Sequence, residues 1–424
     1  MGQRRAGVTA LCCCIMMVAL VAFFITPASS VRFLEMIVRT GDAIQSEADI
    51  DFMISQALRT HIEGISVLMK DDESGLLYYT GSTVPSTRSY NASAGLDYDS
   101  LIKYLLSTAH QSGLKVYAWL PMFKDPVLAQ ADYELATMQK ENSNAALEMS
   151  QLFVSPVNPA VRAHEQDLIS EVLNKFDFDG VRLDFIRFDS DFSDLSNYTR
   201  GVFKSEFGVD PNTIQSDSDY TNWDKWVDFR AAQITSFLKE VVKTVSDIDS
   251  SLDVGAYVLP FAASADGYYG NTQSGNDYSQ YTDNWIKIMP MVYWQDWATA
   301  DNFYDWVNQT IFYANHLTKA KVIPVFSVTS DYAVSEWPLQ PNDTMVDYYL
   351  SRAFATASDN DCPSVSLFYY GKWSDETFQR VAISGDRSMG MSLWNGKHLT
   401  LTIVFFLLTC YSFYKIETFF LSLL

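Results

Sequence analysis

Residues 176–189 read Phe-Asp-Phe-Asp-Gly-Val-Arg-Leu-Asp-Phe-Ile-Arg-Phe-Asp. Side chains alternate between the two faces of a strand, so Val181 and Leu183 share one face while Arg182 and Asp184 share the other. The apolar face suits packing beneath helices, and we interpret the charged face as pointing into a barrel. A buried charged pair is costly unless it is paired or used. Arg182 and Asp184 are therefore either a functional pair, in which Arg182 keeps Asp184 ionised, or a structural ion pair.

The segments around this strand repeat a β/α alternation. Strands are expected at 32–38, 64–69, 115–122, 180–185, 253–259, 286–293, 322–328 and 365–370, because these runs are rich in β-branched or aromatic residues. Helices are expected at 46–59, 98–111, 161–175, 225–245, 301–314, 343–357 and 375–381. Such alternation predicts an α/β fold, a (β/α)8 TIM barrel with long strand-to-helix loops. The alternative, an open doubly wound sheet, would usually bring a glycine-rich phosphate-binding turn, and no such motif follows a strand.

The two ends of the chain differ from its body. Residues 1–30 are expected to be a signal peptide or an N-terminal anchor, and residues 31–385 the barrel. Residues 386–424 read as a spacer followed by a C-terminal hydrophobic anchor or a lipid-anchor signal. These features predict a secreted or cell-surface protein that is attached to a membrane through its C-terminal segment, with one or both termini contacting the membrane. Cys362 is the single cysteine of the body, which excludes an internal disulfide there and favours a buried apolar role.

Composition narrows the choice of partner. The chain has 424 residues, 51 acidic against 30 basic, and a net charge of −21. This balance argues against nucleic acid, whose phosphates require a basic surface. The body, residues 31–390, carries −24, because the excluded ends hold a net +3. A uniformly acidic field would repel an anionic polymer, so neutral or amino sugars are favoured as substrates.

Carboxylates and aromatic residues collect where the expected strands end. In a TIM barrel these C-terminal ends form the active-site face. A glycoside hydrolase needs two carboxyl groups that flank the sugar bond. Asp184 is the first candidate, and Asp71, Asp72, Asp125, Asp296 and Glu336 also follow strands, although each alone could be a solvated loop charge. The candidate catalytic residues are Asp184, Asp296, Glu336 and Asp71, and the candidate substrate-binding residues are Arg182, Arg187, Lys70, Asp125, Tyr293, Trp294, Trp297 and Tyr369. No cofactor and no metal is expected, because the histidines show no paired ligand spacing.

Four stretches carry a resemblance to a known family. They are Lys-Asp-Asp-Glu-Ser-Gly-Leu-Leu-Tyr-Tyr at 70–79, Phe-Lys-Asp-Pro-Val-Leu-Ala at 123–129, Val-Ser-Pro-Val-Asn-Pro-Ala-Val-Arg at 154–162 and Ile-Met-Pro-Met-Val-Tyr at 288–293. With the 178–188 segment they resemble the glycoside-hydrolase-like TIM-barrel families of secreted microbial proteins, in order from about residue 32 to 373. The resemblance implies a carbohydrate substrate and a site around Asp184. Leu68 departs from the pattern where an acidic residue would be expected, and Asp189 where proline often follows.

These observations predict an exported glycoside hydrolase-like protein that acts on an extracellular or cell-envelope polysaccharide or oligosaccharide. Asp184 would be its central carboxyl group, with Arg182 and Arg187 as electrostatic partners. The alternative is a non-catalytic glycan-binding barrel at the cell surface, and a third interpretation is a purely structural barrel. The oligomeric state is left open.

Overall fold

The computed structural model describes residues 33–81, 89–90, 95–216, 218–264, 274–282, 285–299, 301–328, 343–362, 364–371, 378–379 and 381–382. One sheet of parallel strands forms the centre of the molecule, with neighbours in the order β10-β11-β1-β2-β3-β6-β7-β8-β9. Its strands are β1 (Phe33–Val38), β2 (Ile62–Leu68), β3 (Lys115–Pro121), β6 (Gly180–Asp184), β7 (Asp253–Val258), β8 (Lys287–Pro290), β9 (Lys321–Val322), β10 (Val325–Ser327) and β11 (Ser364–Tyr370).

The two edges of this sheet belong to one extended segment. Only Ile323 and Pro324 separate β9 from β10. Ile323 N–H donates to Ile288 on β8, while Ser366 N–H on β11 donates to the Pro324 carbonyl. The segment therefore pairs with β8 on one side and β11 on the other, which closes an eight-stranded barrel. Proline has no N–H, so Pro324 cannot donate a hydrogen bond to a neighbouring strand, and the segment is interrupted between β9 and β10. The predicted (β/α)8 fold is confirmed.

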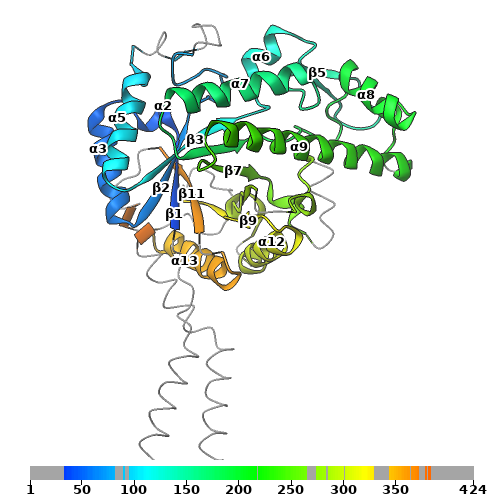
Figure 1. Cartoon of the computed structure of the whole chain (residues 1–424). Helices are drawn as coiled ribbons and strands as arrows, with labels where there is room; N and C mark the ends of the chain where they lie inside the picture. The colour runs from blue at the N-terminus through cyan, green and yellow to red at the C-terminus, as the bar shows by residue number, and fades with distance from the viewer. Residues whose placement is uncertain are drawn as a thin grey trace, which may run out of the picture.

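Helices cover the outside of the barrel (Figure 1). The covering helices are α3 (Glu47–Arg59), α5 (Tyr98–Gln111), α7 (Pro159–Lys175), α9 (Tyr220–Ile248), α12 (Phe303–Leu317) and α13 (Asp343–Asp359). In α3 the Ser46 side chain accepts from Asp49 N–H, and Ile50, Met53 and Ala57 are buried at helical spacing. Shorter helices occupy the connections: α2 (Thr40–Ala43), α6 (Pro126–Ala131), α8 (Asn197–Phe207) and α11 (Trp294–Trp297), with 3-10 turns at Pro211–Thr213, Pro260–Ala262 and Tyr278–Gln280.

A small antiparallel hairpin stands in the connection between β3 and α7. It consists of β4 (Ala136–Gln139) and β5 (Glu148–Val154). Lys124, just after β3, forms an isolated antiparallel bridge with Phe153 of β5. The hairpin therefore lies against the C-terminal end of the barrel strands.

The buried side chains divide into two groups. The larger group packs between the strands and the helices, and it includes Cys362, which is buried and free, as predicted. The second group contains buried side chains of alternate positions along the strands, such as Ile37, Leu68, Trp119 and Tyr257. We assign this second group to the inside of the barrel because strand side chains alternate.

The predicted membrane attachment requires correction. Among the residues that the structure describes, none of the helices combines the length and the apolar character needed to cross a bilayer. Residues 1–30 and 386–424, on which the predicted signal and anchor rest, lie outside the described residues.

Candidate active site

Arg182 does not pair with Asp184, contrary to the expectation from the sequence. Its guanidinium donates to Glu35 of β1, with Nη2–Oε2 at 2.8 Å, and contacts Asp253 of β7 at 3.0 Å. The guanidinium also lies over the Tyr117 ring, 3.6 Å from its centroid. Burial alone would lower the pKa of Arg182, but Glu35 and Asp253 raise it above its usual value. Arg182 is therefore part of a buried ionic layer inside the barrel.

Asp184 lies one step further along β6, at the C-terminal end of the strand. Its carboxylate accepts hydrogen bonds from Phe185 N–H at 2.7 Å and from Trp119 Nε1 at 3.1 Å. The side chain is almost fully buried. Burial raises the pKa of Asp184 above its usual value, Arg187 opposes this shift, and the charge of Asp72 adds to it. A buried carboxyl group with a raised pKa at a barrel strand end has the properties of a general acid or base.

Asp72 is the second carboxylate near Asp184. Arg39 Nη2 contacts one of its oxygens at 3.0 Å, and Lys124 Nζ contacts the other at 3.1 Å. The neighbouring Asp71 has a different environment, because it accepts from Ser74 N–H at 2.8 Å and from the Tyr78 hydroxyl at 3.1 Å within its own turn. The charge of Asp72 acts on Asp184, whereas Asp71 is held by contacts within its own turn.

Phe185 connects two of the cations at this site. Lys124 Nζ lies 4.7 Å and the Arg187 guanidinium 4.3 Å from the centroid of its ring. Arg187 Nη1 also lies 3.7 Å from Asp184 Oδ1, which makes Arg187 the predicted ionic neighbour that Asp184 does have. Phe153 of the hairpin contacts Phe185 edge-on, with centroids 6.0 Å apart. The loop after β6 and the hairpin thus meet at the charged cluster.

A row of half-buried aromatic residues lies beside this cluster. Tyr293 stacks on Trp297 with centroids 5.8 Å apart and on Phe368 with centroids 5.0 Å apart. Phe261 meets Trp297 edge-on at 5.2 Å, and Phe368 likewise contacts Trp119 at 6.3 Å. Stacking on aromatic faces is a common mode of sugar recognition in such an amphipathic row.

Two other aromatic residues, Trp294 and Tyr369, are predicted to bind substrate. Trp294 is buried and packs against Phe303 and Phe326, so it belongs to the core between barrel and helices. The side chain of Tyr369 lies outside the described residues, and so does Glu336.

Asp296 occupies the short helix α11 beside the aromatic row. Its side chain is exposed, and partial burial still raises its pKa above the usual value. Among the described residues no contact between Asp296 and Asp184 is recorded, so the structure leaves Asp296 as a separate carboxyl group at the strand ends.

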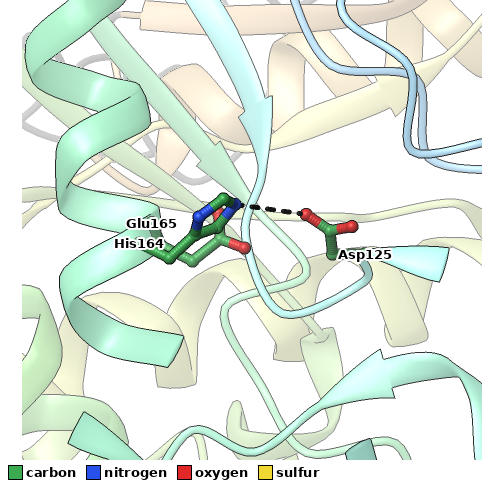
Figure 2. Close-up of side chains that lie close together, drawn as sticks. All are labelled: Asp125, His164 and Glu165. Carbon is green, nitrogen blue, oxygen red and sulfur yellow. Dashed lines mark ion pairs between the residues drawn. The ribbon is translucent and has the colours of Figure 1, made fainter. Parts of the chain in front are cut away.

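Lys70 and Asp125 form a buried ionic cluster of their own. Lys70 Nζ contacts Glu165 at 2.8 Å and Asp125 at 3.4 Å, and it donates to the Met122 carbonyl at 3.0 Å. Figure 2 shows Asp125 facing His164 and Glu165 of α7, with His164 Nε2 3.9 Å from the Asp125 carboxylate. These three side chains could together hold a metal ion, but the Lys70 ammonium already contacts both carboxylates. The side chains of Lys70 and Asp125 are fully buried. We therefore assign them a structural role, in which they hold β2, α6 and α7 together.

Several site residues are not identified by the sequence alone. It does not single out Trp119, Arg39 or Lys124, and it does not favour Asp72 over Asp71. One available signal was Glu35, a single acid in the otherwise apolar strand Phe33–Val38. A lone charge in a buried strand requires a partner, and it could have identified the counter-ion of Arg182.

The comparisons with known proteins agree with this architecture. Residues 37–321 match the family model described as "Putative glycosyl hydrolase domain". A curated relative, the S-layer-related protein of Niallia circulans, is 25% identical over 229 residues, covering 46% of this chain and 14% of the relative. The chain thus spans about a seventh of the length of that relative.

Solved glycoside hydrolases share the fold. The glycoside hydrolase domain of PgaB (BpsB) from Bordetella bronchiseptica superposes with a TM-score of 0.60 at 14% identity, covering 79% of this chain and 93% of that one. The β-galactosidase from Rahnella sp. R3 superposes with a TM-score of 0.56 at 12% identity, covering 86% and 56% of the two chains. At these identities the likeness concerns the fold.

Proposed function

The chain belongs to the family described as "Putative glycosyl hydrolase domain", which matches residues 37–321. From this premise we propose that it hydrolyses glycosidic bonds of a polysaccharide or oligosaccharide at the Asp184 end of the barrel. The observation that carries the proposal is the carboxyl group of Asp184. It is buried against Trp119, ends a barrel strand and has a pKa raised by burial. A glycosidase needs such a group to give a proton to the leaving oxygen.

Asp72 supports the second role in this chemistry. The transition state of glycoside hydrolysis resembles an oxocarbenium ion, which a nearby carboxylate stabilises or attacks. Arg39 and Lys124 hold Asp72 from both sides, so the position of its carboxylate is fixed before substrate arrives. We assign Asp184 to proton transfer and Asp72 to the companion carboxylate. Asp296, Glu336 and Asp71 are the alternative companions that we carry forward from the sequence.

Binding would use the aromatic row and Arg187. Tyr293 and Trp297 are only partly buried and stack in parallel, so a sugar ring can pack against their edges or exposed faces. Arg187 interacts electrostatically with both Asp184 and Tyr293, so it lies near the carboxyl group and the row. Substrate bound on the row would therefore present its glycosidic oxygen toward Asp184.

The test is a glycan-hydrolysis screen of the chain beside Asp184→Asn, Asp72→Asn, Asp296→Asn, Glu336→Gln and Asp71→Asn. We expect Asp184→Asn and Asp72→Asn each to lower kcat by about 100-fold or more, as loss of a proton donor or charge stabiliser does. The matched control is Asp210→Asn, which removes a carboxylate paired with Arg200 at the edge of α8. Equal activity of the parent chain and Asp184→Asn would refute the assignment.

A glycan-binding protein without catalysis is the second candidate. The observation that favours it is that both oxygens of Asp72 and both of Asp184 already have protein partners. In that case the chain would bind an oligosaccharide that it does not cleave, and Trp297→Ala would weaken binding while Asp184→Asn left it unchanged. Isothermal titration calorimetry and chromatography of the same oligosaccharide separate the two candidates.

A further inference from the structure

The charged cluster at the barrel mouth contains more cations than carboxylates. We define this cluster as Arg39, Asp72, Lys124, Asp184 and Arg187. Arg39 and Lys124 contact Asp72 at 3.0 and 3.1 Å, and Arg187 lies 3.7 Å from Asp184. Its formal charge is +1 when both carboxylates are ionised. The whole chain carries −21, so these five side chains together are less acidic than the chain as a whole.

Two cations of the cluster, Arg187 and Lys124, have N–H donors that the two carboxylates do not use. Arg187 Nη1 is buried and makes no hydrogen bond within the described part of the chain, since its nearest carboxylate oxygen is 3.7 Å away. Lys124 Nζ has three donors, and one recorded contact, with Asp72, uses one of them. A buried donor without an acceptor carries a desolvation cost, so an incoming acceptor at this position gains the full value of the bond.

The aromatic ring of Phe185 contacts both of these cations, Lys124 and Arg187. Lys124 and Arg187 both lie over Phe185, at 4.7 and 4.3 Å from its centroid. Both also remain partly accessible, with 16% and 14% of their side-chain surfaces exposed. At this ring Arg187 lies next to Asp184 and Lys124 next to Asp72, and a planar guanidinium matches the two oxygens of a carboxylate.

We propose that Lys124 and Arg187 bind the carboxylate of a uronic acid residue in the substrate, beside the bond that Asp184 acts on. This inference deepens the proposed function and replaces the preference for neutral or amino sugars that overall charge suggested. The net field of the chain acts over long distances and is screened by salt, whereas these cations act at contact distance. An amino sugar in its ammonium form would face like charges at the same position.

The experiment measures binding, so that its outcome does not depend on hydrolysis. The full chain is titrated calorimetrically with tetrasaccharides of galacturonate, glucuronate and mannuronate and with the methyl ester of each, and chromatography checks that each probe stays intact. We expect at least one acid to bind about tenfold more tightly than its uncharged ester, because a hydrogen bond to a charged group is worth about that factor or more.

Variants locate the contact. Arg187→Gln and Lys124→Gln should each weaken binding of the acid by about tenfold and weaken binding of the ester by much less. Arg200→Gln is the matched control, because it removes a partly exposed cation that pairs with Asp210 outside the cluster and should change neither affinity. A fold check by circular dichroism accompanies each variant.

Several outcomes of these titrations would overturn the proposal that Lys124 and Arg187 bind a uronic acid. Equal affinity for acids and esters, binding of neutral or amino-sugar oligosaccharides alone, or no binding of any acid overturns the uronic acid assignment. Preference for a sulfated tetrasaccharide over every uronate also overturns it, since the carboxylate is then not the recognised group. Hydrolysis of a neutral glycan with no acid binding would contradict this inference while leaving the proposed function intact.

Discussion

Arg182 and Asp184 lie on one strand but have separate roles, because their side chains contact different partners. Arg182 and Asp184 share the inner face of β6, yet Arg182 meets Glu35 and Asp253 while Asp184 meets Trp119. Gly255 on the next strand makes room for the guanidinium, since a Cβ there would lie 3.0 Å from Arg182 Cδ. The ionic layer therefore supports the barrel below the site, and Asp184 is left at the mouth.

Breaking this ionic layer should destabilise the barrel strongly. Arg182→Met leaves Glu35 buried without its main partner, which costs about 3–5 kcal/mol of unfolding free energy. Arg200→Met breaks a partly exposed pair with Asp210 and should cost about 1 kcal/mol or less. Urea unfolding of both variants checks the difference. Similar losses for the two would mean that the buried pair contributes no more than a surface one.

Asp184 should make stability depend on pH in a defined direction. Its pKa is raised by burial in the folded state, so the folded chain holds a proton that the unfolded chain has released between the ordinary and the raised value. Stability therefore falls as pH rises through that window, and the destabilisation persists above it. Relative to the parent chain, Asp184→Asn should gain unfolding free energy as pH rises from about 3 toward neutrality. A difference that stays constant with pH would contradict the raised pKa.

At the scale of elements, the barrel strands were predictable because each carries a repeated local signal. Apolar, β-branched runs bounded by polar residues gave all eight strand positions, and helix α5 was found with the predicted bounds, residues 98–111. The β4–β5 hairpin was missed because Glu148–Val154 mixes polar and apolar residues without strict alternation. The site was only partly predictable, because contacts such as Arg182 with Glu35 join residues 147 positions apart and depend on strand register. Adjacent residues such as Asp71 and Asp72 are separated in function only by the shape of one turn.

The start of β6 depends on glycine. Gly180 has φ +150°, and a Cβ there would lie 2.0 Å from the Asp253 carbonyl oxygen. Gly180→Ala should therefore displace β6 from β7 and cost more than about 4 kcal/mol, or prevent folding. Gly208 has φ +76° with open space around it, so Gly208→Ala should cost only about 1–2 kcal/mol. Thermal unfolding of the two variants separates collision from backbone preference, and equal losses would show that the close contact with Asp253 is unimportant.

At the scale of the whole molecule, closure of the barrel brings together charges that the sequence scatters. The site cations come from the ends of different strands: Arg39 follows β1, Lys124 follows β3 and Arg187 follows β6. Closure therefore allows a cluster of formal charge +1 to form within a chain of net charge −21. Solubility and long-range repulsion follow the total, whereas substrate recognition follows the cluster.

The excess of acidic residues should limit stability at low salt. At pH 7 the 51 acidic and 30 basic side chains leave a net charge of −21, and compaction brings these like charges closer together. Raising NaCl from 10 to 200 mM shortens the screening length from about 30 Å to below about 10 Å and should increase the unfolding free energy. The gain should shrink near pH 4.5, where carboxyl groups take up protons and the net charge falls.

Arg182→Met should show the same salt response as the parent chain, because the Glu35 pair is buried beyond the reach of screening ions. Urea titrations at the two salt concentrations and the two pH values measure each of these differences, and a stability that falls with salt at pH 7 would mean that attractive surface pairs outweigh the net repulsion.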